Sequence, residues 1–139
     1  MPFRPLCHHR SVRQERELAL IVVLWIINIV LAIAFAIAGF AKVVRPMSAL
    51  IGMGMKWVDE TSERTVRAIG SIELAGVAGL ILPKATGIAP GLTPLAAIGL
   101  ATIMLGALVV HLKRAESVTS PMILGGLAVV SAAIGFALV

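Results

Sequence analysis

The residue with the clearest chemical potential is Glu73, because it is the only charged residue between positions 68 and 83. A carboxyl group in hydrocarbon is costly unless it is paired, solvated or protonated. Two interpretations therefore stay open. Glu73 forms a structural bridge to a neighbouring helix, or it marks a site for a ligand or a proton.

Three further residues lie toward the same end of the predicted helices as Glu73. Lys42 follows the first apolar stretch, Trp57 lies in the connection after it, and His111 closes the third stretch. A Lys42–Glu73 pair would neutralise the carboxylate, and His111 could hydrogen-bond it. We expect a ligand-binding pocket here, roofed by the connection that holds Trp57. The alternative is that Lys42 extends to the lipid headgroups and His111 merely lies at the interface.

Several classes of catalytic or metal site find no support in the sequence. No H-E-x-x-H, Walker or G-x-G-x-x-G motif is present, and no Ser-His-Asp set is evident. Cys7 is the only cysteine, so an internal disulfide and a C-x-x-C relay are both excluded. Cys7, His8 and His9 have no further ligand nearby, so we expect no metal there. We also expect no cofactor, and we favour a protein that is not an enzyme.

The elements that must position these residues are helices in a membrane. Hydrophobic residues make up 59% of the 139 residues and charged residues 14%, against about a quarter in soluble domains. Four nearly uncharged stretches follow one another, each long enough for a hydrocarbon core of about 30 Å. Barrel strands would be shorter and would alternate. The sequence predicts an all-α transmembrane four-helix bundle with spans at about 18–41, 66–83, 92–112 and 120–139.

The N-terminal residues 1–17 form a basic tail that we expect to be flexible. A signal peptide is the competing interpretation, but the apolar stretch that follows exceeds the usual h-region of about 7–15 residues, so we favour a retained helix. The formal net charge of +5 lies mainly in the tail and the connections. We assign it to lipid phosphates and not to nucleic acid. Lys and Arg do not separate clearly between the two sides, and the basic tail favours termini in the cytoplasm.

The longest connection, residues 42–67, mixes charged and apolar side chains. We expect a short helix at the membrane surface that begins at Pro46 and holds Trp57 at headgroup depth. Asp59, Thr61 and Ser62 are candidate N-caps for the next span. In the fourth span, Ser120 and Pro121 are expected at the start of the helix.

Glycines mark the faces on which the spans should pack. Gly70, Gly76 and Gly79 form a slowly winding stripe in the second span, and small residues let membrane helices approach closely. We therefore expect this stripe to face another helix. A second packing surface is predicted at the glycines of the third span, and a third at those of the fourth. These glycines are Gly99, Gly106, Gly125, Gly126 and Gly135.

Several segments together carry a family resemblance. They are Ala38–Lys42 with Arg45-Pro46, Gly52–Val58, Gly70–Pro83, Thr86–Leu95, Met104–Gly106 and His111–Arg114. Over about residues 30–139 the chain resembles the DoxX-like family of small four-helix membrane proteins. It departs from that pattern in its long basic tail and in Pro121.

The resemblance implies an integral, multi-pass protein of the bacterial plasma membrane, and the family's lysine and glutamate carry over to Lys42 and Glu73. Some members are linked to membrane oxidoreductase systems, including thiosulfate-to-quinone electron transfer. Distant eukaryotic relatives look like assembly factors for membrane receptors.

Three functions remain open, and the lipid bilayer is a partner in each. The first is a non-catalytic subunit or scaffold of a larger membrane complex or homo-oligomer, which we favour. The second is a redox accessory that binds quinone or another apolar ligand near Glu73. The third is a small transporter or proton pathway, which would need more intramembrane charges than this one carboxyl group.

Overall fold

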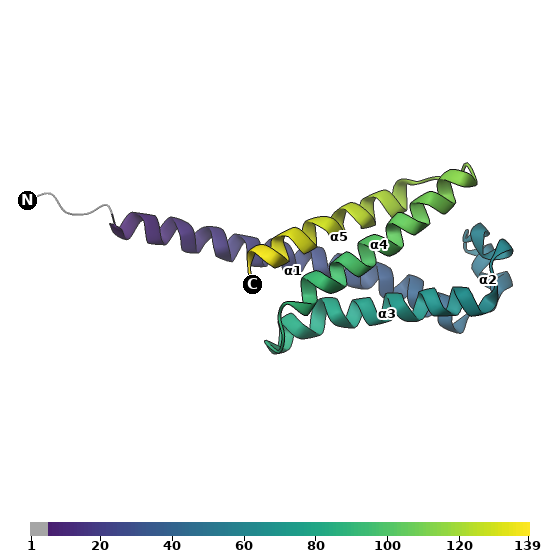
Figure 1. Ribbon diagram of the computed structural model, residues 1–139, viewed down its shortest axis with the longest axis horizontal. Helices are drawn as coiled ribbons and strands as arrows, with labels where there is room; N and C mark the ends of the chain where they lie inside the picture. Colours follow the sequence, from purple (N-terminus) through teal and green to yellow (C-terminus); the bar gives the residue numbers. More distant parts are fainter. Residues whose placement is uncertain (1–5) are drawn as a thin grey trace, which may run out of the picture.

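A computed structural model describes residues 6–139, with side chains from residue 11 onward, and its fold is all-α (Figure 1). No strand occurs in this part of the chain. Four of its helices are long and apolar enough to cross a membrane, so the predicted all-α four-helix bundle is confirmed. The elements are α1 (Leu6–Val44), α2 (Met47–Gly52), the 3-10 helix η1 (Lys56–Glu60), α3 (Glu63–Thr86), α4 (Leu92–Lys113) and α5 (Thr119–Ala137).

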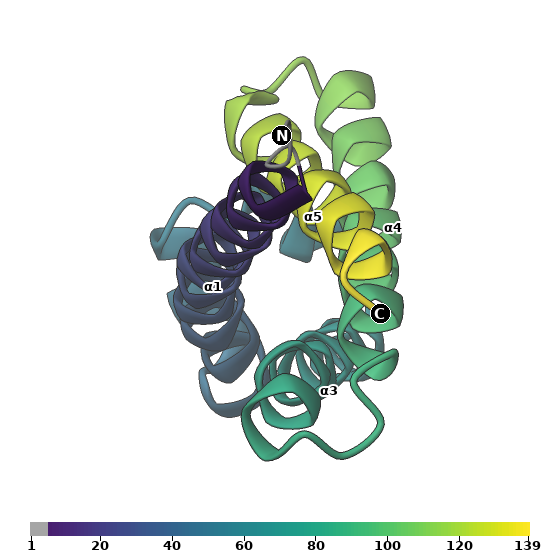
Figure 2. The same cartoon turned by 90° about the vertical axis from the view of Figure 1, so that its left-hand side faces the viewer.

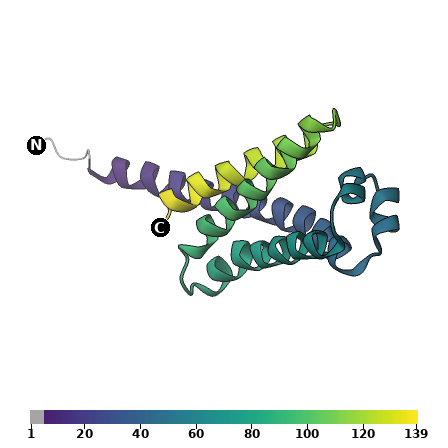
Figure 3. The same cartoon turned by 45° about the vertical axis from the view of Figure 1, so that its right-hand side comes forward.

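The four long helices surround a common axis in the order α1, α3, α4, α5, as the end-on view shows (Figure 2). Neighbours run antiparallel, so α1 and α4 end where α3 and α5 begin. We call this the α2 end, because α2 and η1 lie there (Figure 3). The bundle interior is filled by side chains from all four helices, including Leu31, Phe35, Leu80, Leu100 and Ala128.

Large apolar side chains also cover the outside of the bundle. Ile26, Ile33 and Ile37 are each more than half exposed along α1. The buried positions of the same helix recur every three or four residues, at Leu24, Asn28 and Leu31 for example, which is the spacing of one helix face. The outer face therefore suits acyl chains and not water.

The helix ends follow from local chemistry. Ser62 caps α3, because its Oγ accepts a hydrogen bond from the Thr65 amide at 3.2 Å. Gly87 ends α3 at φ 71°, a left-handed conformation that suits glycine. Pro83 lies inside the last turn and does not end the helix, so α3 extends past the predicted boundary to Thr86.

The N-terminal end of α1 differs from the predicted start of the first span. Residues 6–17, expected to be a flexible tail, are helical and extend α1 toward the N-terminus. The exposed pair Arg13–Glu17, with 3.5 Å between Nε and Oε1, is spaced for one helical turn. Residues 1–5 and the side chains of Cys7, His8 and His9 lie outside the described structure, so the metal question at those side chains stays a prediction.

The glycine faces are only partly as predicted. An added Cβ at Gly76 or Gly79 would meet Leu100 or Ala96 of α4 at 2.6 and 2.9 Å, so this stripe does face another helix. The predicted α4 surface packs against no described part of the chain, because an added Cβ at Gly99 or Gly106 meets no atom within 4 Å. Spacing places two glycines on one face, but α4 is apolar on every side, so nothing indicates whether that face points inward.

The fourth span packs through two of its three predicted glycines. An added Cβ at Gly125 would lie 3.2 Å from Met104, and one at Gly135 would lie 3.0 Å from Pro94. Gly126 meets nothing within 4 Å. Gly125 and Gly135 therefore allow α5 to approach α4 closely at these two positions.

Candidate functional site

The site is built on a crossing of α1 and α3 in which two backbones touch. A Cβ added at Gly70 would lie 2.7 Å from the Gly39 carbonyl oxygen and 2.8 Å from Lys42 Cβ. A Cβ added at Gly39 would lie 2.9 Å from the Gly70 carbonyl oxygen. Only glycine fits at both positions, so these residues set the distance between the helices.

One turn beyond each glycine, the crossing places a lysine and a glutamate together. Lys42 Nζ donates to Glu73 Oε1 at 2.5 Å. Lys42 is 7% exposed and Glu73 is 1% exposed, so water is largely excluded from the pair. Because the helices approach so closely, the lysine reaches the carboxylate within the bundle. Each charge offsets the desolvation cost of the other.

Trp57 of η1 lies on the Lys42 side of this pair. The Trp57 ring centroid lies 6.0 Å from Lys42 Nζ, at the limit of a cation–π contact. Two residues of the α2–η1 segment, Leu50 and Val58, are fully buried against Ala41 of α1 and Val66 of α3. Three of the four predicted ligand residues are thus brought together.

The pair leaves one polar atom free. Glu73 Oε2 is buried and has no hydrogen-bond partner in the described structure. A carboxylate oxygen accepts hydrogen bonds, so this atom can take one from a hydroxyl or an ammonium group, or it can take a proton. In a medium of low polarity an unpaired buried oxygen is costly, which favours a partner at this position.

The prediction that His111 hydrogen-bonds Glu73 is wrong. His111 Nδ1 lies 3.1 Å from Glu116 Oε2, an ion-pair distance without the geometry of a hydrogen bond. The reason is the turn after α4. Ala115 adopts φ 52°, and the Glu116 amide donates to the His111 carbonyl oxygen at 2.9 Å. The chain folds back, so the nearest acid to His111 comes from its own connection.

Arg114, next to this turn, ties two connections together at the α2 end. It donates to Glu116 at 2.9 Å, pairs with Glu60 of η1 at 2.6 Å, and donates to the Lys56 carbonyl oxygen at 3.3 Å. Its hydrogen bonds to Glu116 and Glu60 raise the pKa of the Arg114 guanidinium. The same bond from Arg114 holds the pKa of Glu116 below its usual range.

Two polar contacts were not predicted from the sequence. Ser131 Oγ donates to Asn28 Oδ1 at 2.5 Å between α5 and α1, and both residues are fully buried. Arg67 of α3 donates to the Val43 carbonyl oxygen in the last turn of α1, where a cation is favoured. Asn28 was visible as a polar residue in an apolar stretch, but a single polar residue does not reveal its partner.

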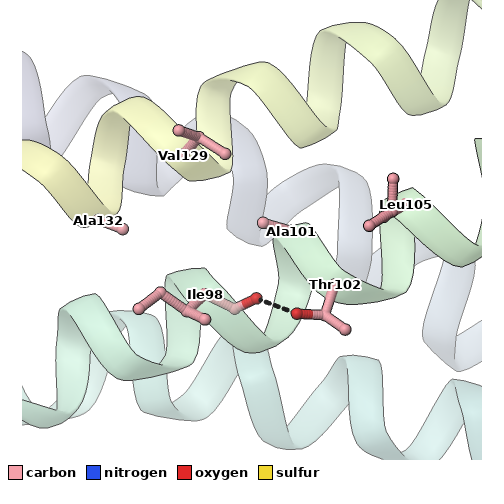
Figure 4. A pocket seen from close by; sticks show the side chains of 6 residues that line it. All are labelled: Ile98, Ala101, Thr102, Leu105, Val129 and Ala132. Carbon is pink, nitrogen blue, oxygen red and sulfur yellow. Dashed lines mark hydrogen bonds between the residues drawn. The ribbon is translucent and has the colours of Figure 1, made fainter.

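A separate apolar groove of about 340 Å³ lies between α4 and α5 (Figure 4). None of the four predicted ligand residues lines it, and the one side-chain hydroxyl there, of Thr102, donates to the Ile98 carbonyl oxygen at 2.9 Å. Its lining residues are Ile98, Ala101, Thr102, Leu105, Val129 and Ala132. Across the described residues, no group of three or more His, Cys, Asp and Glu side chains is placed to hold a metal ion.

Four apolar helices around an interior that holds a buried ion pair define a small multi-pass membrane protein. The profile of the DoxX-like family matches residues 26–135, which is most of the chain. The chain therefore belongs to the DoxX-like family. Searches of curated proteins and of solved structures find no significant match.

Proposed function

We propose that the protein is a non-catalytic subunit or scaffold of a membrane complex and that it contacts its partner through the outer surface of α4 and α5. The α4–α5 groove is the observation that carries the proposal, because it is apolar and is lined in part by small side chains (Figure 4). Gly106 lies beside Thr102 on the α4 surface and has open space around it. Small residues and a groove allow a partner helix to approach closely.

The ion pair between Lys42 and Glu73 also supports a non-catalytic role. Lys42 and Glu73 neutralise each other across the α1–α3 crossing, so they stabilise the bundle itself. The α4 glycines have no such role within the chain, because side chains added at Gly99 and Gly106 would meet nothing. A surface glycine in a membrane helix lowers helix propensity. Close contact with a second protein at that glycine would offset this cost.

The test is affinity purification of the tagged protein in mild detergent after expression at its native level. The parent is expected to retain a partner in stoichiometric amount. Gly106→Leu should lose it, because the larger side chain blocks close approach. Val22→Leu is the matched control, since Val22 is 57% exposed on α1 and lies outside the groove. A parent protein that carries lipid alone, or a Gly106→Leu variant that retains the partner, contradicts the proposal.

A second candidate function is the binding of an amphipathic ligand, such as a quinone in its hydroxyl form, at Lys42 and Glu73. The specific observation in its favour is the unpartnered, buried Glu73 Oε2, which would accept the ligand hydroxyl. Trp57 offers a ring above the same pair, and His111 lies at the same end of the bundle.

Its test is quinone content by mass spectrometry after purification. Glu73→Gln should reduce the bound quinone strongly, because the neutral amide cannot form the same charge-assisted contact. Asp59→Asn is the control, since Asp59 is an exposed acid of η1 at the same end of the bundle. Equal quinone content in Glu73→Gln and in the parent rules out this function.

A further inference from the structure

The segment between α1 and α3 is attached to the bundle in two different ways. Its apolar underside, Leu50 and Val58, is fully buried against α1 and α3. Its outer end is attached by Arg114, which follows α4 and is distant in sequence. Arg114 contacts two residues of η1, through the Glu60 carboxylate and the Lys56 carbonyl oxygen.

We propose that residues 46–61 form a lid over the Lys42–Glu73 pair and that Arg114 is the latch that holds the lid closed. We keep the word lid for these residues. The proposal goes beyond the scaffold function and does not depend on it, because it concerns access of water and headgroups to the ion pair within one chain.

The lid has the features of a segment that moves as a unit. It begins at Pro46, whose ring fixes φ, and it ends at Thr61 in an extended conformation. Gly54 turns the chain between α2 and η1 at φ 94°. Within the lid, Thr61 Oγ1 donates to the Trp57 carbonyl oxygen at 3.0 Å, and the Met55 amide donates to the Leu50 carbonyl oxygen at 3.0 Å. The first contact closes the end of η1, and the second joins α2 to the residue before η1.

The connection between α4 and α5 holds the Arg114 guanidinium in position. Glu116 accepts a hydrogen bond from Arg114 Nε at 2.9 Å, and the guanidinium has a second nitrogen 2.6 Å from Glu60. The planar guanidinium binds two carboxylates at once, so the α4–α5 connection and the lid share one cation. Loss of Arg114 removes this polar bridge and leaves two carboxylates at the same position.

Opening of the lid would change the environment of the pair beneath it. The Trp57 ring lies over Lys42 Nζ, and Glu73 Oε2 is buried with no partner. When the lid lifts, water or a headgroup bearing a hydroxyl or ammonium group gains access to that oxygen. The closed lid thus excludes water from the pair, and the latch sets how often it opens.

The test uses the two tryptophans of the chain, Trp25 and Trp57. The protein is labelled with 5-fluorotryptophan, placed in phosphatidylcholine nanodiscs, and studied by fluorine NMR with a water-soluble gadolinium chelate. The paramagnetic relaxation of each tryptophan signal reports its access to water. Trp25 lies 17 residues before Lys42 on α1, so it reports on the other end of the bundle.

Arg114→Gln is expected to raise the relaxation of Trp57 by about threefold and to leave Trp25 unchanged, since losing a partly exposed ion-pair network shifts a local equilibrium modestly. Glu60→Gln should act in the same direction. Arg64→Gln is the matched control, because Arg64 is exposed and makes no side-chain hydrogen bond or ion pair in the described structure. Two results overturn the proposal: no change at Trp57 in Arg114→Gln, or an equal rise at both tryptophans, which indicates general loosening.

Discussion

Replacement of Gly70 by alanine tests the crossing on which the site is built. The added methyl group would lie 2.7 Å from the Gly39 carbonyl oxygen, 2.8 Å from Lys42 Cβ and 3.1 Å from Val43 Cγ2. Ordinary contacts of this kind are about 3.5–4.0 Å. The nearest atom belongs to the backbone and cannot rotate away, so α1 and α3 must separate by about 0.5–1 Å.

The expected free energy follows from two opposing terms. Overpacking a closely fitted contact costs about 1–3 kcal/mol, and the better helix propensity of alanine returns about 1 kcal/mol. The net effect of these two terms is a loss of about 0–2 kcal/mol of stability. Separation of the helices also lengthens the Lys42–Glu73 contact, whose present length is 2.5 Å, which adds to the loss.

The assay is reversible unfolding by sodium dodecyl sulfate in mixed micelles, followed by circular dichroism. Gly106→Ala is the matched control, because it makes the same change in a membrane helix where an added Cβ meets nothing within 4 Å. We expect Gly106→Ala to be neutral or to stabilise by up to about 1 kcal/mol. If Gly70→Ala proves as stable as Gly106→Ala, the close crossing of α1 and α3 is refuted.

Two further predictions concern contacts outside that crossing. Ser131→Ala should destabilise the protein by about 0.5–1.5 kcal/mol in the same unfolding assay, because it removes the one side-chain hydrogen-bond partner that the fully buried Asn28 has among the described residues. The double variant Asn28→Leu with Ser131→Ala should recover part of that loss. If the double variant loses as much stability as Ser131→Ala alone, the result argues against a buried hydrogen bond. Acidification should weaken the contact between Arg114 and Glu116, because the pKa of Glu116 is lowered in the folded protein. The contribution of this contact to stability is full above the unfolded pKa of about 4.3. It is lost as the pH falls through the pKa of the folded protein. Fluorine relaxation of Trp57 between pH 7 and pH 3 (about the range where carboxylates protonate) should rise in the parent and rise less in Glu116→Gln.

Much of the architecture follows from the sequence because lipid imposes a simple rule. Uncharged stretches of about 20 residues must be helices in a membrane, and this predicts all four spans and the end of the bundle at which Lys42 and Glu73 meet. Ser62 as the cap of α3 follows from local chemistry in the same way. These features depend on one segment or on the order of segments alone.

The remaining features depend on which sides of the helices meet, and a helix that is apolar all around does not reveal this. The spacing of Gly99 and Gly106 suggests a packing face, but both have open space around them, whereas Gly39 and Gly70 form a crossing in which two backbones meet. His111 lies beside Glu116 because of a turn at Ala115 that the composition of the connection does not indicate. Partner choice is a tertiary property, so hydrophobic periodicity carries no information about it.

The central claim is that Lys42 and Glu73 form one buried pair that stabilises the α1–α3 crossing, and a double-mutant cycle tests it most directly. The unfolding free energy is measured for the parent, Lys42→Met, Glu73→Gln and the double variant in the same micelles. Each single change leaves the other residue buried without its partner, so we expect the double variant to be more stable than the sum of the two losses implies, by about 1–3 kcal/mol. Additive losses would contradict the pair and the site built on it.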